Sequence, residues 1–454
     1  MKVRERNLEF IKTLIEYEKV AGTKILEYLD YLVKTQWLEN KELIKLQNKK
    51  LREIIKYSYE NIPYYHELFK KLSLKPGDIK NREDLTRLPV LTKADIQKNF
   101  HKLSNSNLSP EDLISNTTSG STYTPLRFLI DREMISWSKA AQLRAFQWAN
   151  FYPWDRFAYF WAFFPDEEQD GVFDLLNKNF NLILPLNCFN LSDEKFEGYY
   201  DQIIEFKPKI LQAIPNPLYM FAKFLKRRNL ELKDLTSIIT NAEMITRNQK
   251  QFIQEVFKCP VFDVYGAREL ALIIGECPET QNKHLSMETA ITEIIKDGEH
   301  VDDGEEGEII VTNLINYAMP FIRYRVGDIA KQKLDLCECG RGLSLIDSLE
   351  GRINDFLLTI DGKYLPGIFF PAVFAYHDMK GIAQYQIRQK ISKELEVILV
   401  KEKNFQESDL DKFVDIIKRF MGDIELKIKY VNEIPQTSAG KRRYTISELN
   451  LKLY

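Results

Sequence analysis

The sequence predicts an α/β fold, in which layers of helices cover sheets whose strands alternate with them along the chain. One observation supports this class. Between about residues 110 and 330, short apolar runs of strand length alternate with stretches of helical periodicity. The strand candidates are residues 157–164, 209–214, 235–240 and 261–265, and the helix candidates are residues 217–228 and 247–257. The chain has 454 residues, which is enough for two or three domains with a large core.

The first 70 residues have a helical pattern. Apolar side chains recur there at helical spacing among Lys, Glu and Asn, and they include Leu43, Leu46, Leu51, Ile54 and Ile55. Pro63 interrupts the pattern, because an interior proline removes a helical hydrogen bond. Thr92 stands where an N-cap would begin a further short helix. We therefore expect a helical lead-in over residues 1–70.

The C-terminal third changes character twice. Residues 287–350 are β-like, with hairpin-type turn signals at Asp297-Gly298 and Asp303-Gly304. The pattern then restarts with a strand at 395–400, a helix at 410–420 and a strand at 426–431. The sequence thus predicts a large N-terminal domain over 1–350, whose last part is β-rich, and a small α+β domain over 351–454.

The balance of charge argues against two classes of binding protein. Lys and Arg total 64 against 66 Asp and Glu, for a net charge of −2, whereas proteins of nucleic acids and anionic membranes usually carry a basic excess. No stretch approaches ~20 consecutive apolar residues, so we expect no integral membrane segment. The charged N-terminal segment lacks the apolar core of a secretory signal. These features predict a cytoplasmic protein.

The stretch 116–128, NTTSGSTYTPLRF, concentrates hydroxyls and backbone N–H groups where the chain cannot easily be helical. Successive N–H groups can form a concave nest for an anion, and hydroxyls add donors. The residues that would form this nest are Thr118, Ser119, Gly120, Ser121 and Thr122. Phosphate is the obvious guest, and a polar surface turn is the alternative.

Four later stretches carry residues that suit a nucleotide site, although each alone has an ordinary structural explanation. Two of them follow predicted strands, where ligands of α/β sheets bind. The four stretches are NAEMIT with Ala242 and Glu243, VYGAREL with Tyr265, Gly266 and Glu269, RYRVGDIA with Asp328, and PQTSAGKRRY with Lys441. Tyr265 could stack on a base, Glu269 could hold a hard cation, and Asp328 could accept from ribose hydroxyls. The last stretch is not a Walker A loop, because Pro435 and Arg442 stand where Gly and Ser/Thr are required.

Taken in order, these stretches resemble the landmarks of the adenylate-forming superfamily, and in particular phenylacetate–CoA ligases and CapK-type capsule-biosynthesis proteins. The matching segments are SYENIPYYHELF, LPVLTKADI, TTSGSTYTP, YGAREL, MPFIRYRVGD, LEGRINDFL and PQTSAGKRRY. The resemblance covers about residues 40–450. It implies a two-step ligase that joins a carboxylic acid to ATP as an acyl-adenylate, releases pyrophosphate, and passes the acyl group to an acceptor such as coenzyme A.

The resemblance also implies roles for individual residues. Ser119–Thr122 would cradle the β- and γ-phosphates, Tyr265 would lie against adenine, and Glu269 would hold Mg²⁺. Asp328 would bind the ribose, and Arg352 would lie near the ribose and phosphate at a domain boundary. Lys441, on a mobile lid formed by the C-terminal domain, would bridge the carboxylate and the α-phosphate. The catalytic residues would then be Lys441 and Glu269.

Three departures from the family pattern leave the acceptor open. Tyr123 stands where the phosphate loop usually has Gly, and Asn354 stands where the hinge after Arg352 usually has Asp. The segment LLTIDGKYLPG replaces the Gly-rich turn that lines the pantetheine tunnel. The acceptor is therefore coenzyme A, or an amine or hydroxyl such as one on a sugar in capsule or surface-polysaccharide biosynthesis. A non-catalytic relative that binds nucleotide or a protein partner is the alternative function.

The five cysteines indicate thiols or a metal site rather than a disulfide framework. Cys277 and His284 are close in sequence, and Cys337 and Cys339 are separated by one residue. Three thiolates and an imidazole make a closed tetrahedral set for a structural Zn²⁺. Unrelated polar-loop residues are the alternative. Cys188 and Cys259 lie in apolar surroundings and are expected in the core.

Overall fold

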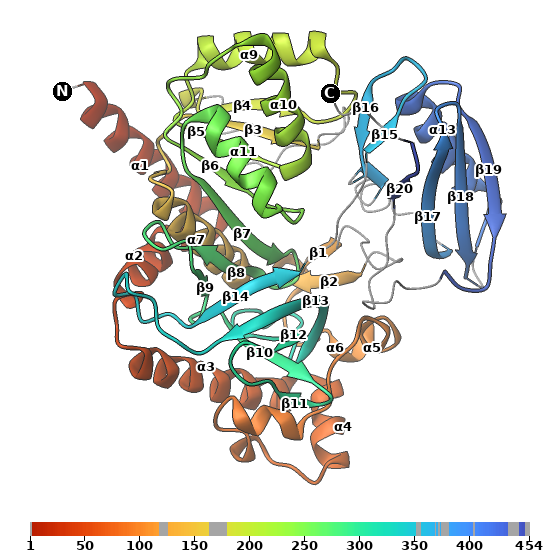
Figure 1. Cartoon of the computed structure of the whole chain (residues 1–454). Coiled ribbons are helices and arrows are strands. Elements are labelled where there is room, and N and C mark those ends of the chain that lie inside the picture. Colours follow the sequence, from red (N-terminus) through yellow and green to blue (C-terminus); the bar gives the residue numbers. More distant parts are fainter. Residues whose placement is uncertain are drawn as a thin grey trace. The chain divides into compact units, whose positions relative to one another are not determined.

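The structure is a computed structural model that divides into two compact units. Its helices and strands are labelled in Figure 1. Unit 1 comprises Met1–Asn116, Leu126–Trp154 and Phe262–Gly351, and unit 2 comprises Thr117–Pro125, Asp155–Val261 and Arg352–Tyr454. The residues that the structure describes are 2–117, 126–162, 179–350, 356–367, 369–370, 373, 381–402, 405–434 and 445–449. Helices and strands alternate along the chain, which confirms the predicted α/β class.

The helical lead-in of unit 1 is confirmed. Its helices are α1 (Lys2–Ala21), α2 (Ile25–Thr35), α3 (Asn40–Asn61) and α4 (Pro63–Lys71). Later in unit 1 come α5 (Lys93–Lys98), α6 (Phe100–Leu103) and α7 (Arg132–Trp148), with short 3₁₀ segments at Pro76–Asp78, Glu83–Arg87 and Pro110–Asp112. Pro63 begins α4, where its missing N–H costs no helical hydrogen bond. Thr92 caps α5 by accepting from the backbone N–H of Asp95 at 3.2 Å.

The sheet of unit 1 has the strand order β11-β10-β12-β13-β14-β9-β8-β7, and each neighbouring pair runs antiparallel. The strands are β7 (Val261–Ala267), β8 (Ala271–Glu276), β9 (Lys283–Leu285), β10 (Ala290–Lys296), β11 (Glu299–His300), β12 (Glu306–Asn313), β13 (Tyr324–Lys333) and β14 (Leu345–Glu350). A separate two-stranded sheet pairs β1 (Ile114–Thr117) with β2 (Arg127–Ile130). Strands β7, β8 and β9 of this antiparallel sheet lie before residue 287.

The sheet of unit 1 is strongly curled. Strands β14, β9 and β8 lie between β13 and β7 in the strand order. Even so, Tyr265 of β7 donates a hydrogen bond to Asp328 of β13, and Tyr324 of β13 donates to Glu269 just beyond β7. Side chains can only reach across in this way if the sheet bends back on itself. The curl brings together residues from widely separated parts of the chain.

Unit 2 contains a parallel sheet with strand order β6-β5-β3-β4. Its strands are β3 (Phe157–Trp161), β4 (Ile183–Asn187), β5 (Ile210–Ala213) and β6 (Ser237–Thr240), and the helices that alternate with them are α9 (Asp193–Phe206), α10 (Pro215–Arg228) and α11 (Arg247–Phe257). Every residue of β5 and β6 is buried, as expected for parallel strands covered on both faces. Cys188 and Cys259 are buried as predicted.

The C-terminal part of unit 2 forms a second, mixed sheet with the order β19-β18-β17-β20. Its strands are β17 (Ile382–Ile391), β18 (Glu394–Lys401), β19 (Glu425–Tyr430) and β20 (Thr445–Ser447); α13 (Glu407–Met421) joins β18 to β19, and a hairpin pairs β15 (Phe356–Leu358) with β16 (Tyr364–Pro366). The predicted strand, helix and strand of this region are confirmed as β18, α13 and β19.

Candidate nucleotide site and metal centre

The hairpin of β7 and β8 positions three of the predicted site residues. Tyr265 and Gly266 lie near the end of β7, and Glu269 lies in the three-residue turn that follows. The ladder has an irregular register between Tyr265 and Gly266. A Cβ at Gly266 would come within 2.5 Å of the carbonyl oxygen of Ala271. Only glycine fits this close approach of the two strands, which fixes the shape of the turn.

Glu269 is a buried carboxylate with a neutral partner. It is 5% exposed, and its Oε1 accepts a hydrogen bond from the Tyr324 hydroxyl at 3.0 Å. The Asn313 amide donates to its main-chain carbonyl at 3.4 Å. Across the described ranges, no Lys or Arg forms an ion pair with Glu269. A carboxylate held by a neutral hydroxyl is the kind of oxygen donor that suits Mg²⁺.

Asp328 is the second carboxylate of this half-site. Its Oδ2 accepts from the Tyr265 hydroxyl at 2.8 Å. The preceding Gly327 has a φ of +92°, a conformation that favours glycine. The structure thus brings Tyr265, Glu269 and Asp328 into one region of unit 1. Residue type and order predicted these three residues but gave no sign of the Tyr324 hydroxyl, although Tyr324 lies within the segment RYRVGDIA.

Ala242 and Glu243 lie in unit 2, in the loop after β6. Ala242 has a φ of +72°, which is uncommon for a residue with a Cβ and marks a constrained loop. Glu243 is 7% exposed. The loop follows the carboxyl end of a parallel strand, the position where ligands of such sheets bind. The other predicted residues lie outside the described ranges; they are Thr118, Ser119, Gly120, Ser121, Thr122, Arg352 and Lys441, together with Tyr123 and Asn354.

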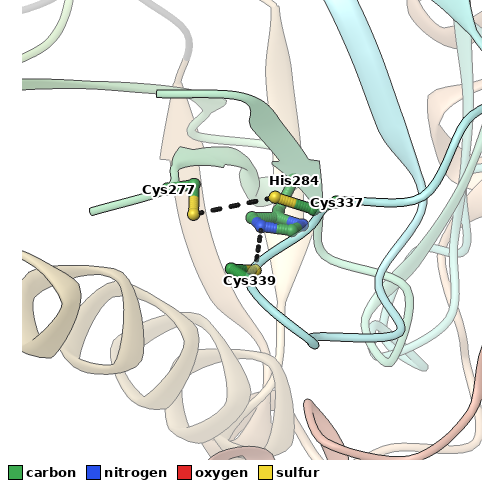
Figure 2. Close-up of side chains that lie close together, drawn as sticks. All are labelled: Cys277, His284, Cys337 and Cys339. Carbon is green, nitrogen blue, oxygen red and sulfur yellow. Dashed lines mark hydrogen bonds between the residues drawn. The ribbon is translucent and has the colours of Figure 1, made fainter. Parts of the chain in front are cut away.

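Three cysteines and one histidine converge in unit 1 (Figure 2). Cys277 directly follows β8, His284 lies on β9, and Cys337 and Cys339 lie in the loop between β13 and β14. Their ligand atoms all lie within 4.8 Å of one another. Because β8 and β9 are neighbouring strands and the loop precedes β14, the partner of β9, the sheet itself brings these segments together.

The spacing of these atoms fits a tetrahedral metal. The Sγ atoms of Cys277 and Cys337 are 3.8 Å apart, and Cys339 Sγ is 3.4 Å from His284 Nε2. Zinc bonds of about 2.3 Å to sulfur and about 2.0 Å to nitrogen give tetrahedral edges of about 3.8 Å and 3.5 Å. A disulfide would need sulfur atoms about 2.05 Å apart. The donor set therefore fits Zn²⁺ and does not fit a cystine.

The pKa shifts of His284 and Cys337 suit metal binding, whereas burial raises the pKa of Cys339 to about 11. Burial lowers the pKa of His284 to about 4, so the imidazole is neutral near pH 7. Its Nδ1 faces the carbonyl of Leu343 at 3.4 Å, which leaves Nε2 for the cluster. Burial would raise the pKa of Cys337, but hydrogen bonds from Thr280 and Asn282 lower it below its usual value. Neutral imidazole and thiolate are the forms that bind zinc.

The loop around the cluster is packed tightly against the junction of α2 and α3. A Cβ at Gly342 would come within 2.0 Å of the carbonyl oxygen of Leu38. The guanidinium of Arg341 lies 4.5 Å from the centroid of the Trp37 ring, and its Nε donates to Gln36 at 3.2 Å. The cluster therefore lies where the sheet meets the helical lead-in.

Solved structures define the class of fold. The chain aligns with 2-hydroxyisobutyryl-CoA ligase in the postadenylation state, in complex with R3-HIB-AMP, at a TM-score of 0.59 and 18% identity, over 90% of each chain. An open conformation of 2-hydroxyisobutyryl-CoA ligase in complex with 2-HIB-AMP and CoA gives the same TM-score at 19% identity, over 90% of this chain and 92% of that chain. The chain thus shares the fold of 2-hydroxyisobutyryl-CoA ligase.

Comparison of sequences shows which proteins the chain is similar to. Residues 357–448 match the family model described as CapK C-terminal domain. Protein CapK of Staphylococcus aureus is 25% identical over 417 residues, 90% of each chain. The phenylacetate-coenzyme A ligase of Thermus thermophilus is 23% identical over 344 residues, 72% of this chain and 74% of that one. The chain is a homologue of CapK and of phenylacetate–CoA ligases, which confirms the predicted resemblance. In the described part of the chain, no helix combines the length and apolar character needed to cross a membrane.

Proposed function

We propose that the protein is an ATP-dependent ligase that activates a carboxylic acid as an acyl-adenylate and transfers the acyl group to an acceptor. The observation that carries this proposal is the pair of carboxylates, Glu269 and Asp328, each held by a tyrosine hydroxyl in unit 1. Two carboxylates of this kind suit the metal and the ribose of a bound nucleotide. Support also comes from the relatives, because phenylacetate–CoA ligases and 2-hydroxyisobutyryl-CoA ligase activate carboxylic acids.

In the first step a carboxylate oxygen attacks the α-phosphorus of ATP, and pyrophosphate leaves. The two reactants are anions, so cationic groups must offset their repulsion and orient them. Lys441 would lie between the carboxylate and the α-phosphate, and Glu269 would bind Mg²⁺. Mg²⁺ at that position would neutralise phosphate charge. Asp328 would bind the ribose and Tyr265 would contact the adenine, which together would fix the nucleotide.

In the second step a nucleophile attacks the acyl carbon, and AMP leaves with the oxygen that the acid supplied. We propose coenzyme A as this nucleophile, since the named relatives include CoA ligases. An amine or hydroxyl, for example on a sugar of a surface polysaccharide, is the alternative acceptor. The segment LLTIDGKYLPG, which replaces the Gly-rich turn of the family, is the feature that supports this alternative.

We also propose that Cys277, His284, Cys337 and Cys339 hold a structural Zn²⁺. All four positions of a tetrahedral ion would be filled by protein, so no position would remain for water or substrate. The ion would stabilise the fold and would take no part in catalysis. It would join β8, β9 and the loop before β14, and through Arg341 and Gly342 it would support the junction of α2 and α3.

Acid-dependent exchange of labelled pyrophosphate into ATP tests the first step, over a panel of carboxylic acids. We expect exchange with at least one acid, and a loss on the order of 10²–10³-fold in Lys441→Ala. Lys418→Ala is the control, because Lys418 is an exposed lysine of α13 that pairs only loosely with Asp423 at 3.7 Å. Unchanged exchange in Lys441→Ala would remove the lysine from the mechanism. No exchange with any acid would instead favour a non-catalytic nucleotide-binding relative.

A further inference from the structure

Tyr324 is a buried tyrosine whose hydroxyl is bonded to a carboxylate. It is the first residue of β13 and its side chain is 0% exposed. Its hydroxyl donates to Glu269 Oε1 at 3.0 Å, and its ring lies 5.0 Å from that of Phe321. A hydroxyl buried this deeply needs a hydrogen-bond partner, and here the partner is the carboxylate that the proposed function assigns to Mg²⁺.

The backbone before Tyr324 is held in a constrained conformation. Arg323 has a φ of +55°, a left-handed value that is costly for a residue with a Cβ. Its guanidinium is bound by the buried carboxylate of Glu293, at 3.2 Å from Nε, and by the carbonyl of Leu88 at 2.6 Å. These hydrogen bonds offset the strain. The constrained residue therefore determines the direction in which the chain enters β13.

The main chain on both sides of Tyr324 is also fixed. The N–H of Leu91 donates to the carbonyl of Arg323 at 2.8 Å, and the N–H of Arg325 donates to the carbonyl of Leu91 at 2.9 Å. Leu91 thus forms a parallel bridge across Tyr324. Because the backbones of Arg323 and Arg325 are both hydrogen-bonded, the main chain at Tyr324 is fixed. The Tyr324 hydroxyl is therefore directed to Glu269 from an ordered backbone.

Two buried glutamates of unit 1, Glu293 and Glu269, differ in the charge of the group that binds them. Glu293 is 0% exposed and pairs with the guanidinium of Arg323, which neutralises its charge. Glu269 is similarly buried but is held by a neutral hydroxyl. A hydroxyl donor orients a carboxylate without cancelling its charge. Glu293 is therefore part of a structural ion pair, whereas Glu269 remains able to attract a cation.

We propose that Tyr324 is a positioning residue for Glu269, and this inference rests on the proposed function. Its hydroxyl holds one carboxylate oxygen so that the charged group is presented in one orientation to a divalent cation that binds with the nucleotide. Partners that orient metal ligands in this way typically change metal affinity by about 10–100-fold when they are removed. Tyr324 acts through Glu269 and does not itself contact the reactants.

The test compares Tyr324→Phe with Tyr65→Phe. Tyr65 is also buried, and its hydroxyl donates to the carbonyl of Pro320 at 2.8 Å and accepts from the N–H of Ile322 at 3.1 Å. Each variant removes one buried hydroxyl from unit 1, but only Tyr324→Phe removes a partner of Glu269. Mn²⁺ serves as the probe, and its binding in the presence of a non-hydrolysable ATP analogue is measured by electron paramagnetic resonance. Urea unfolding of both variants shows that they are folded.

We expect Tyr324→Phe to weaken Mn²⁺ binding by about 10–100-fold, and to leave affinity for the analogue in EDTA unchanged. Tyr65→Phe should bind Mn²⁺ as the wild type does. In a Glu269→Gln background, Tyr324→Phe should not weaken Mn²⁺ binding further, because the carboxylate through which Tyr324 acts is already absent. Equal Mn²⁺ binding in Tyr324→Phe and Tyr65→Phe would overturn the inference, and so would a wild type that binds no Mn²⁺. If the variants bound Mn²⁺ as expected but the wild type exchanged no pyrophosphate, the proposed ligase activity would be wrong, and Tyr324 would position Glu269 for cation binding alone.

Discussion

The candidate metal centre and the candidate nucleotide site, formed by Tyr265, Glu269 and Asp328, both lie on the curled sheet of unit 1, but their donor groups are arranged differently. In the metal centre, four ligand atoms lie within 4.8 Å of one another; they belong to Cys277, His284, Cys337 and Cys339. The carboxylates of Glu269 and Asp328 instead accept hydrogen bonds from the hydroxyls of Tyr324 and Tyr265. In the proposed metal centre the protein would supply all four ligands of the ion. In the proposed nucleotide site the carboxylates would bind a ligand from outside the protein. Changes in the first should therefore act on stability, and changes in the second on binding and rate.

The largest expected effect is on stability, at the metal centre. Cys337→Ser should abolish zinc binding and cost more than about 4 kcal/mol of unfolding free energy, because loss of a structural metal is among the most destabilising single changes. Metal analysis and urea unfolding measure both quantities. Cys259→Ser is the matched control, since Cys259 is a buried thiol outside the cluster. Protein purified without chelator that contains no zinc would contradict the proposed centre.

A smaller effect, on rate, is expected at Glu269. Glu269→Gln keeps the shape of the side chain but removes its charge, so pyrophosphate exchange should fall by about 10²–10³-fold. Unfolding free energy should change by only about 1 kcal/mol. Glu276→Gln is the control, because Glu276 is also buried and accepts from the backbone N–H of Asp263 at 2.7 Å. If both variants exchanged pyrophosphate equally well, Glu269 would have no special part in the reaction.

The smallest of the three effects is expected in nucleotide affinity. Asp328→Asn should raise the dissociation constant for ATP by about 10–100-fold, since hydrogen bonds to charged groups contribute about 1.5–3 kcal/mol. Calorimetric titration measures this change. Asp347→Asn is the control, because Asp347 is a half-exposed residue of β14 that pairs loosely with Lys331 at 3.5 Å. An unchanged ATP affinity in Asp328→Asn would place the ribose elsewhere.

Local pattern predicted the elements that depend on nearby residues. The helix expected over 247–257 has those bounds as α11, because Thr246 caps its start and amphipathic spacing defines its length. Strands β8 and β9 were not predicted. Strand β8 is a short, largely buried run that periodicity cannot separate from a helix, and β9 has only three residues. Their pairing depends on segments far away in the chain.

The same limit applies to the site. Glu269, Asp328 and the four Cys and His residues were identified from their types and order. The hydroxyl of Tyr324 was not, because its partner lies 55 residues away and reaches it only through the curl of the sheet. The left-handed φ of Arg323 left no signal either, since arginine is not a residue that usually marks this conformation. The hydrogen bond from Tyr324 to Glu269 and the conformation of Arg323 therefore became apparent only from the three-dimensional structure.

The central claim is that the carboxylic acid attacks the α-phosphorus of ATP. A carboxylic acid labelled with oxygen-18 in its carboxylate tests this most directly, once an acid that supports exchange is known. The acid, ATP and acceptor are turned over by the wild-type protein, and the products are analysed by mass spectrometry. We predict that AMP carries one labelled oxygen and that pyrophosphate carries none. Label in inorganic phosphate, or none in AMP, would contradict an acyl-adenylate intermediate.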